Sequence, residues 1–301
     1  MPMASLSRPT PWKRPTLLIA GCGDIGVRVL RLLARRWRVL ALTHAPSRVA
    51  ELRALGARPL VGDLDRPETL GRLGAVADAV LYLAPPPSSG CTDPRSAHLA
   101  AALRRGGRVR RVVYASTSGV YGDLAGARID ETQPVRPQTE RAWRRVDAEA
   151  RWRAFGRGTG ARVTILRVPG IYALDRAGGD PRERVARGAP VLVAADDVYT
   201  NHIHADDLAR ACAAALHRGL PQRVVHASDA SELRMGDYYD LVADRFGMAR
   251  PPRVRRADAA SVLGAATLSF MSESRRLSNR RLREELRVRL RYPRVDDALA
   301  R

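Results

Sequence analysis

Short apolar runs alternate with longer stretches of helical periodicity along most of the chain. The apolar runs predict buried strands at 16–21, 38–43, 58–62, 79–84, 111–116, 162–167 and 223–227. The stretches between and after them predict helices at 27–33, 48–55, 94–105, 138–155, 206–218, 234–246 and 277–286. Strands that alternate with helices are typical of a parallel sheet covered on both faces. The pattern therefore predicts an α/β fold with a doubly wound parallel sheet.

A glycine-rich motif connects the first strand to the first helix. It runs from Gly21 to Gly26 with the spacing G-x-G-x-x-G, and it encloses Asp24 and Ile25. In this context Gly21 allows a tight turn, Gly23 lets the backbone approach a pyrophosphate, and Gly26 lets the helix pack closely on the strand. The free N–H groups at the start of the helix suit phosphate oxygens. We therefore expect a Rossmann-type fold that binds a dinucleotide, with a plain tight turn as the alternative.

The end of the second strand bears on the choice of cofactor. NAD-binding folds place an acidic residue about 20 residues beyond the glycines, where it binds the ribose hydroxyls. Here no acid lies between the second strand and Glu51, and Thr43 and Arg48 occupy that segment instead. Because a guanidinium binds phosphate through paired hydrogen bonds, the segment favours NADP(H) over NAD(H). In the alternative interpretation, Ser47 caps the next helix and Arg48 is solvated.

Two further segments are expected to border the cofactor. Asp63 and Leu64 follow the third strand, where a carboxylate can accept a hydrogen bond from the adenine amino group. A simple turn role for Asp63 is an equally good interpretation. Ala84 and Pro85 end the fourth strand and complete the expected cofactor border.

Beyond the strand at 162–167 the pattern becomes less regular. We expect residues 1–14 to be a disordered tail, and 15–173, with 201–229 returning to it, to form the NAD(P)-binding domain. Residues 174–200 are rich in Gly, Asp and Arg. Together with 230–301 they are expected to form a smaller C-terminal lobe that binds the substrate.

The composition limits which cellular compartment and which binding partners we expect for this chain. The chain of 301 residues carries a formal net charge of +21, but its 52 basic residues include a single lysine. Arginine is spread through every segment, as expected for a bacterial protein of a GC-rich genome, and no basic cluster is interleaved with aromatic residues, which argues against specific nucleic-acid binding. The sequence has no membrane-length apolar run and no signal-peptide pattern, and three scattered cysteines suit a reducing cytoplasm.

Several blocks in a fixed order resemble the short-chain dehydrogenase/reductase superfamily, and within it the atypical members of the extended epimerase/dehydratase branch. The blocks are Gly21 to Gly26, Gly62-Asp63-Leu64, Ser116 to Gly122, Glu131 to Pro137, Leu166 to Tyr172, Asn201 to Leu208, and Tyr292-Pro293. The resemblance implies NAD(P)-dependent chemistry on a nucleotide sugar or another carbonyl or alcohol substrate, in a family where homodimers are common. It also implies that Thr117 occupies the catalytic Ser/Thr position and that Pro169 contacts the cofactor.

One departure from the family affects the chemistry directly. The family's Tyr-x-x-x-Lys pair is absent, because the only lysine is Lys13, and the two positions fall on Arg141 and Arg145. Arg145 can hold ribose hydroxyls, whereas Arg141 stays protonated and suits an anion rather than proton transfer. Tyr121 is a further candidate for the proton donor, with packing of its turn as the alternative. The alternatives for the arginines are an ion pair between Arg145 and Glu149 and a solvated Arg141.

The segment His202 to Asp207 contains two histidines and two aspartates, which raises the question of a metal site. Alternation on a strand places His202 and His204 on one face, but zinc needs a third and usually a fourth ligand. Asp206 as the cap of the following helix is the simpler interpretation, so we expect no metal.

Together these features predict an NAD(P)-dependent oxidoreductase or epimerase/dehydratase-like enzyme with an atypical active site and a small-molecule substrate. The missing Tyr/Lys pair supports a second hypothesis, a non-catalytic NADP(H)-binding protein that senses redox state or binds a partner protein.

Overall fold

The computed structural model describes residues 14–71 and 73–299, so residues 1–13 of the predicted tail lie outside the described part. Seven parallel strands form the central sheet in the order β11-β7-β5-β4-β1-β2-β3. They are β1 (Thr16–Ala20), β2 (Arg38–Thr43), β3 (Arg58–Val61), β4 (Ala79–Tyr82), β5 (Arg111–Thr117), β7 (Arg162–Val168) and β11 (Arg223–His226). Each corresponds to a predicted strand, so the α/β fold with a doubly wound sheet is confirmed.

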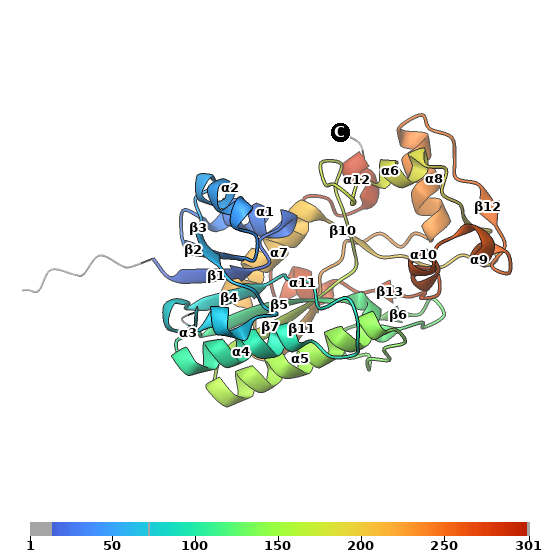
Figure 1. The fold of residues 1–301 in the computed structure, drawn as a ribbon. Helices are drawn as coiled ribbons and strands as arrows, with labels where there is room; N and C mark the ends of the chain where they lie inside the picture. The colour runs from blue at the N-terminus through green and yellow to red at the C-terminus, as the bar shows by residue number, and fades with distance from the viewer. Residues whose placement is uncertain (1–13, 72, 300–301) are drawn as a thin grey trace, which may run out of the picture.

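Helices cover both faces of this sheet (Figure 1). One face carries α1 (Asp24–Leu33), α2 (Val49–Ala54), α7 (Ala205–Arg218) and α11 (Arg280–Glu284), and the other carries α3 (Leu73–Val76), α4 (Pro94–Gly106) and α5 (Glu140–Thr159). In β1, Leu17 and Ile19 face the first group of helices, whereas Leu18 and Ala20 face the second. A strand buried on both faces has an unbroken apolar sequence, which explains why these strands were predictable.

The strand order reverses between β1 and β4. The chain runs outward from β1 through β2 to β3, then crosses back so that β4 pairs with the other side of β1. Ligands of open parallel sheets bind at the carboxyl ends of the strands, at such a point of reversal. Gly21 follows β1 and Ala84 lies two residues beyond β4, so the fold brings two predicted cofactor segments together here.

Two predicted helix caps are wrong. The short 3₁₀ turn η1 (Pro46–Arg48) precedes α2, and no side chain caps either element, so Ser47 is not a cap. At α7 the capping side chain is His204, whose Nδ1 accepts a hydrogen bond from the amide of Asp206 at 3.2 Å. Burial lowers the pKa of His204 and leaves this nitrogen free to accept. Asp206 instead pairs with Arg28 on α1.

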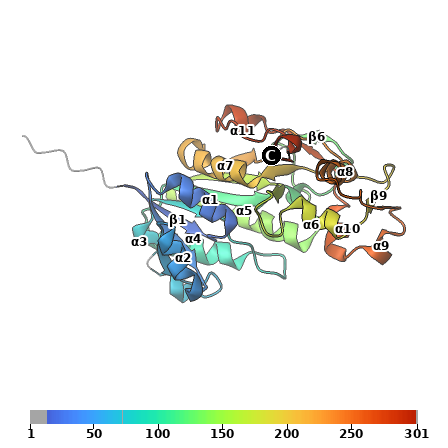
Figure 2. The ribbon, with the colours of Figure 1, turned by 90° about the horizontal axis from the view of Figure 1, so that it is seen from above.

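The remaining elements lie mostly beyond the carboxyl ends of the sheet strands (Figure 2). They are η2 (Pro67–Leu70), η3 (Ser118–Tyr121), β6 (Arg128–Ile129), β8 (Gly170–Tyr172), α6 (Pro181–Ala186), β9 (Val191–Leu192), β10 (His202–His204), α8 (Met235–Arg245), β12 (Arg253–Val254), α9 (Ala259–Val262), α10 (Ala265–Phe270), β13 (Arg276–Leu277) and α12 (Val295–Leu299). The strands pair as β10-β8, β12-β9 and β13-β6. A hydrophobic cluster that includes Val185, Tyr238 and Val295 packs α6, α8 and α12 together. The division into a cofactor domain and a substrate lobe stays a prediction, and α11, within the predicted lobe, packs on the sheet beside β11.

Candidate active site

The glycine turn after β1 is closely packed except at one position. Gly21 has a φ of +89°, and a Cβ on it would lie 2.4 Å from the backbone nitrogen of Ala84. A Cβ on Gly26 would lie 3.1 Å from the carbonyl oxygen of Gly21, so α1 packs directly on the turn. At Gly23, by contrast, no atom lies within 4 Å of a Cβ position, and no side chain caps α1. The uncapped amides and the open space beside Gly23 fit the pyrophosphate of a dinucleotide.

A cavity of about 420 Å³ opens beside this turn, at the ends of β1 to β4. Among the described residues, its lining includes eight of the predicted cofactor positions: Gly21, Gly23, Thr43, Arg48, Asp63, Leu64, Ala84 and Pro85. The sequence placed these residues in four separate segments, and the fold brings all four to one cavity. Its position at the reversal of strand order is that of a nucleotide site.

Arg48 extends along the glycine turn rather than into solvent. Its Nη1 donates to the carbonyl oxygen of Cys22 at 2.6 Å, and its Nε and Nη2 donate to the carboxylate of Glu51 at 3.1 and 2.9 Å. Arg48 lines the cavity, whereas Glu51 is not part of its lining. Burial raises the pKa of the Cys22 thiol to about 11, so this thiol is not ionised at neutral pH.

The other predicted cofactor residues lie apart from this cavity. The carboxylate of Asp24 pairs with Arg28 at 3.0 Å and with Arg176 at 3.1 Å. Ile25 is buried in the core beneath α1. Pro169 lines a second, larger cavity.

This second cavity has a volume of about 970 Å³, and Pro85 lines both cavities. Thr117, Arg141 and Arg145 all line it, so the structure brings together three of the four predicted catalytic residues. Its walls also come from α6, α8 and α10. Among the described residues, seven arginines but only three carboxylates line it, so its surface is strongly positive: Arg141, Arg144, Arg145, Arg176, Arg184, Arg187 and Arg275, against Asp180, Glu183 and Glu273.

The two arginines at the Tyr and Lys positions differ in their contacts. Arg145 donates from Nη1 to the hydroxyl of Tyr114 at 3.1 Å and to the carbonyl oxygen of Ala115 at 2.9 Å. The predicted alternative, a pair with Glu149, is not formed, because Glu149 binds elsewhere. Arg141 stacks on the ring of Phe270 at 4.1 Å. Within the described chain Arg141 has no hydrogen-bond or ion-pair partner, and burial lowers its pKa.

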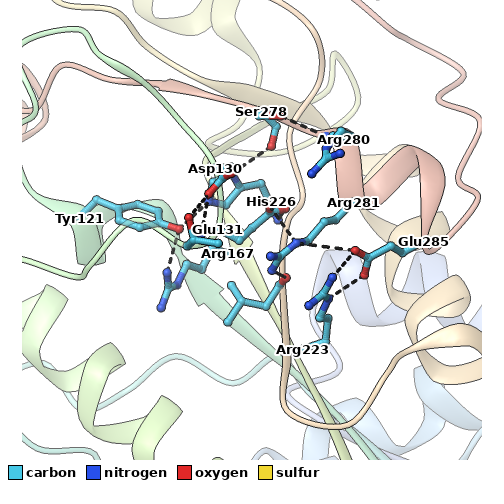
Figure 3. Close-up of polar contacts among 12 residues, drawn as sticks. Tyr121, Asp130, Glu131, Arg167, Arg223, His226, Ser278, Arg280, Arg281 and Glu285 are labelled. Atoms are coloured by element: carbon cyan, nitrogen blue, oxygen red, sulfur yellow. Dashed lines mark hydrogen bonds and ion pairs between the residues drawn. The ribbon is translucent and has the colours of Figure 1, made fainter.

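Tyr121 lies in a buried polar network and not on the cavity wall (Figure 3). Nδ1 of His226 is 3.0 Å from the carbonyl oxygen of Ser278, which can only accept, so Nδ1 carries the hydrogen. Nε2 then accepts from the Tyr121 hydroxyl at 2.5 Å, and that hydroxyl accepts from Arg167 at 2.8 Å. Tyr121 is fully buried, so its position favours the packing alternative.

The network extends from the sheet to α5 and α11. Arg167 binds the carboxylate of Glu149 through two hydrogen bonds, at 3.0 and 2.7 Å. Glu131 accepts from the amide of His226 at 2.9 Å and pairs with Arg281. Burial lowers the pKa of His226 to about 3, so its ring is neutral.

A buried carboxylate of the larger cavity, Glu273, was not predicted from the sequence. Glu273 lies between α10 and β13, is only 7% exposed, and borders the cavity beside Thr117 and Gly119. It accepts from Arg275 at 3.0 Å through Oε2, whereas its Oε1 is buried without a partner. Its segment contains no recognisable motif, so no sequence pattern indicated it.

The histidine pair shows no metal arrangement. His202 stacks on Tyr238, with ring centroids 4.1 Å apart, and His204 caps α7. Across 14–71 and 73–299, no group of three His, Cys, Asp or Glu residues could hold a metal ion. In the same part of the chain, no helix is both long and apolar enough to cross a membrane.

Comparison with known proteins agrees with this geometry. A family model described as NAD(P)H-binding matches residues 21–219, which begin at the glycine turn and include Thr117, Arg141 and Arg145. The chain belongs to this NAD(P)H-binding family. The predicted dinucleotide-binding character is therefore confirmed.

Solved structures similar to this NAD(P)H-binding protein share its whole fold. A protein of unknown function from Silicibacter pomeroyi is 31% identical with a TM-score of 0.79, covering 95% of this chain and 97% of its own. UDP-glucose 4-epimerase from Thermotoga maritima is 19% identical with a TM-score of 0.76, covering 94% and 96%. The fold that the resemblance implies, a doubly wound sheet with further elements at the carboxyl ends of its strands, is thus shared with these structures.

A curated relative provides a chemical comparison. The 4-hydroxy-2-methyl-3-oxo-4-farnesyl-3,4-dihydroquinoline-1-oxide ketoreductase of Stigmatella aurantiaca is 23% identical over 245 residues. The match covers 77% of this NAD(P)H-binding protein and 73% of the relative.

Proposed function

We propose that the protein is an NADP(H)-dependent oxidoreductase that interconverts a carbonyl and an alcohol on a substrate carrying an anionic group. The observation that carries the proposal is the meeting of two cavities at Pro85. The smaller one has the lining of a nucleotide site, and the larger one contains Thr117 and Arg145. The similarity to a ketoreductase supports carbonyl reduction as the reaction class.

In this proposal the smaller cavity holds the adenosine part of the cofactor. The amides that follow Gly21 and Gly23 bind the pyrophosphate, and Asp63 and Leu64 border the adenine. Arg48, beside Thr43, binds the 2′-phosphate that distinguishes NADP(H) from NAD(H). When bound, the nicotinamide supplies or accepts the hydride.

In the larger cavity Thr117 and Arg145 would position the reacting groups. The Thr117 hydroxyl oxygen accepts from the amide of Gly119 at 3.2 Å, so its hydrogen remains available for the reacting oxygen of the substrate. Arg145 is fixed by Tyr114 and Ala115 through one nitrogen, and its other N–H groups remain for the nicotinamide ribose. Arg145 would thereby take over one task of the family's lysine, which is to hold the ribose hydroxyls.

The positive wall supports an anionic substrate. Arg141 has no polar partner among the described residues, and the Nε of Arg184 is buried without one. Partial burial of the Arg141 guanidinium without a polar partner costs free energy, and a carboxylate or phosphate of the substrate would offset that cost. The larger cavity is big enough for a nucleotide sugar of the kind named for the epimerase neighbour.

A second candidate function is non-catalytic NADP(H) binding, in redox sensing or partner binding. It is favoured by one observation, that Arg141 occupies the position of the family's proton-transferring tyrosine. An arginine cannot exchange a proton near neutral pH. This candidate predicts tight cofactor binding without turnover.

A substrate panel separates the two candidates. Purified protein is mixed with NADPH or NADH and phenylglyoxylate, and with NADP⁺ or NAD⁺ and mandelate, UDP-glucose or UDP-glucuronic acid, while the reduced cofactor is followed by absorbance. The proposal expects turnover of at least one compound that Thr117→Val lowers by about 100-fold, as for loss of a transition-state hydrogen-bond donor. Cofactor binding with no turnover of any of these compounds contradicts it and favours the non-catalytic candidate.

A further inference from the structure

Glu273 is a buried carboxylate on the wall of the larger cavity, in a segment far from the motifs of the sequence. Its side chain is 5% exposed, and so is nine-tenths or more buried. One oxygen, Oε2, is held by Arg275, while Oε1 is buried without a hydrogen-bond partner. A buried carboxylate oxygen without a donor requires an explanation, because such groups are normally hydrogen-bonded.

A substrate bound in the larger cavity would provide one, because the same carboxyl group lies near Thr117 through its other oxygen, Oε2. Gly119 has no Cβ, and the point where one would stand lies 3.5 Å from Thr117 Oγ1 and 3.7 Å from Glu273 Oε2. All three residues line the larger cavity. A substrate oxygen in the space beside Gly119 is therefore within reach of both the Thr117 hydroxyl and the Glu273 carboxyl group.

The surrounding charges fix the carboxyl group without blocking it. Arg275 is itself held by the carbonyl oxygen of Gly122 at 2.8 Å, so its guanidinium orients Oε2 from behind. Arg141 on α5 lines the same cavity as Glu273 and is close enough for the carboxylate to act on its pKa, and Asp123, in the loop after η3, acts likewise on the pKa of Arg275. The family's tyrosine would stand on α5 at position 141, so Glu273 approaches the place where the proton donor is missing.

We propose that Glu273 is the acid–base residue of this enzyme and exchanges a proton with the reacting oxygen of the substrate. The inference rests on the proposed oxidoreductase function. In alcohol oxidation the O–H proton passes to the Glu273 carboxylate, and the carbon–hydrogen electron pair leaves as hydride to the oxidised cofactor. The oxygen's electron pair forms the C=O bond. In reduction the same atoms move in reverse, and solvent restores the protonation state of Glu273 after each turnover.

The test is Glu273→Gln, which keeps the size of the side chain and removes its ionisation. We expect kcat for the best panel substrate to fall by at least about 100-fold, the usual contribution of a general acid or base. NADPH affinity should be unchanged, whereas the melting temperature should fall because Arg275 loses its buried counter-charge. In the wild type, kcat/KM for alcohol oxidation should depend on pH, and the variant should lose that dependence. Glu285→Gln is the matched control, because Glu285 is also paired with an arginine but lies outside the cavity.

A second variant tests the reaction space even if Glu273→Gln is unstable. Gly119→Ala places a methyl group beside the two side chains at ordinary van der Waals distances, so the fold should tolerate it. It should reduce kcat/KM by more than 10-fold while NADPH still binds.

Different results would overturn the proposed oxidoreductase function and the proposed role of Glu273. A wild-type protein that turns over no panel compound overturns the oxidoreductase function, and the role of Glu273 with it. An active wild type whose Glu273→Gln variant keeps its rate and pH profile, or whose Gly119→Ala variant keeps full activity, overturns the role of Glu273 alone.

Discussion

Replacing Arg48 by alanine tests the assignment of NADP(H) as the preferred cofactor. Arg48 lines the smaller cavity, and its guanidinium already spans the glycine turn through its 2.6 Å bond to the carbonyl oxygen of Cys22. A hydrogen bond to a charged group contributes about 1.5–3 kcal/mol. The Arg48 side chain is 32% exposed, so screening by solvent favours the lower end of that range. About 1.5 kcal/mol corresponds to roughly a tenfold change in Kd.

The assay is calorimetric titration of wild type and Arg48→Ala with NADPH and with NADH. The ratio of the two Kd values is the relevant quantity, because loss of the bond to Cys22 can weaken both cofactors through the turn. We expect the preference for NADPH to fall about tenfold. Arg53→Ala is the control, since Arg53 lies in the last turn of α2, the helix that follows Arg48, but outside the cavity.

Replacing Glu51 should have the opposite effect on NADPH affinity. Its carboxylate accepts two hydrogen bonds from Arg48, and a 2′-phosphate would compete with it for the same guanidinium. Glu51→Gln should therefore raise NADPH affinity and leave NADH affinity unchanged. An unaltered NADPH/NADH ratio in Arg48→Ala would refute the assignment of Arg48 to the 2′-phosphate.

Three further predictions concern stability and substrate binding. Gly21→Ala should lower the free energy of unfolding in urea by at least about 2 kcal/mol, because it combines a strained φ with a backbone clash at Ala84; a smaller loss would show that the turn can relax. Arg141→Met should raise KM for phenylglyoxylate about tenfold with little change for an uncharged ketone, and equal effects on both would argue against anion binding. Because burial lowers the pKa of His226 to about 3, the unfolded state binds more protons between pH 3 and about 6.5, so the free energy of unfolding should decrease as the pH falls through this range. His226→Gln should reduce that pH slope, by up to about 1.4 kcal/mol per pH unit, and an unchanged slope would contradict the neutral buried ring.

The sheet and the nucleotide site were predictable from the sequence for a shared physical reason. Strands buried on both faces appear as apolar runs, and parallel strands deliver the residues that follow them to one edge of the sheet. Arg48 and Asp63 could therefore be assigned to one site although separate segments carry them. Gly21 was identifiable because only a residue without Cβ fits its positive φ against Ala84.

The features that sequence analysis missed depend on contacts between distant segments. His204 caps α7 in place of Asp206 because burial keeps its imidazole neutral and Asp206 binds Arg28, which no local pattern reveals. Tyr121 faces His226, more than 100 residues away, rather than the cavity. Glu273 reaches the space beside Thr117 only because Ser274 and Arg275 bind the loop that follows η3.

The central claim is that the open space beside Gly23 and the uncapped start of α1 bind the pyrophosphate of a nicotinamide cofactor. Calorimetric titration of the full chain with NADPH, repeated on Gly23→Val, tests it most directly. We expect saturable one-to-one binding in the wild type and its loss in the variant, whose side chain enters that space and whose Cβ meets no protein atom within 4 Å. Absence of binding by NADPH, NADH and their oxidised forms, or equal affinity in Gly23→Val, would contradict the claim.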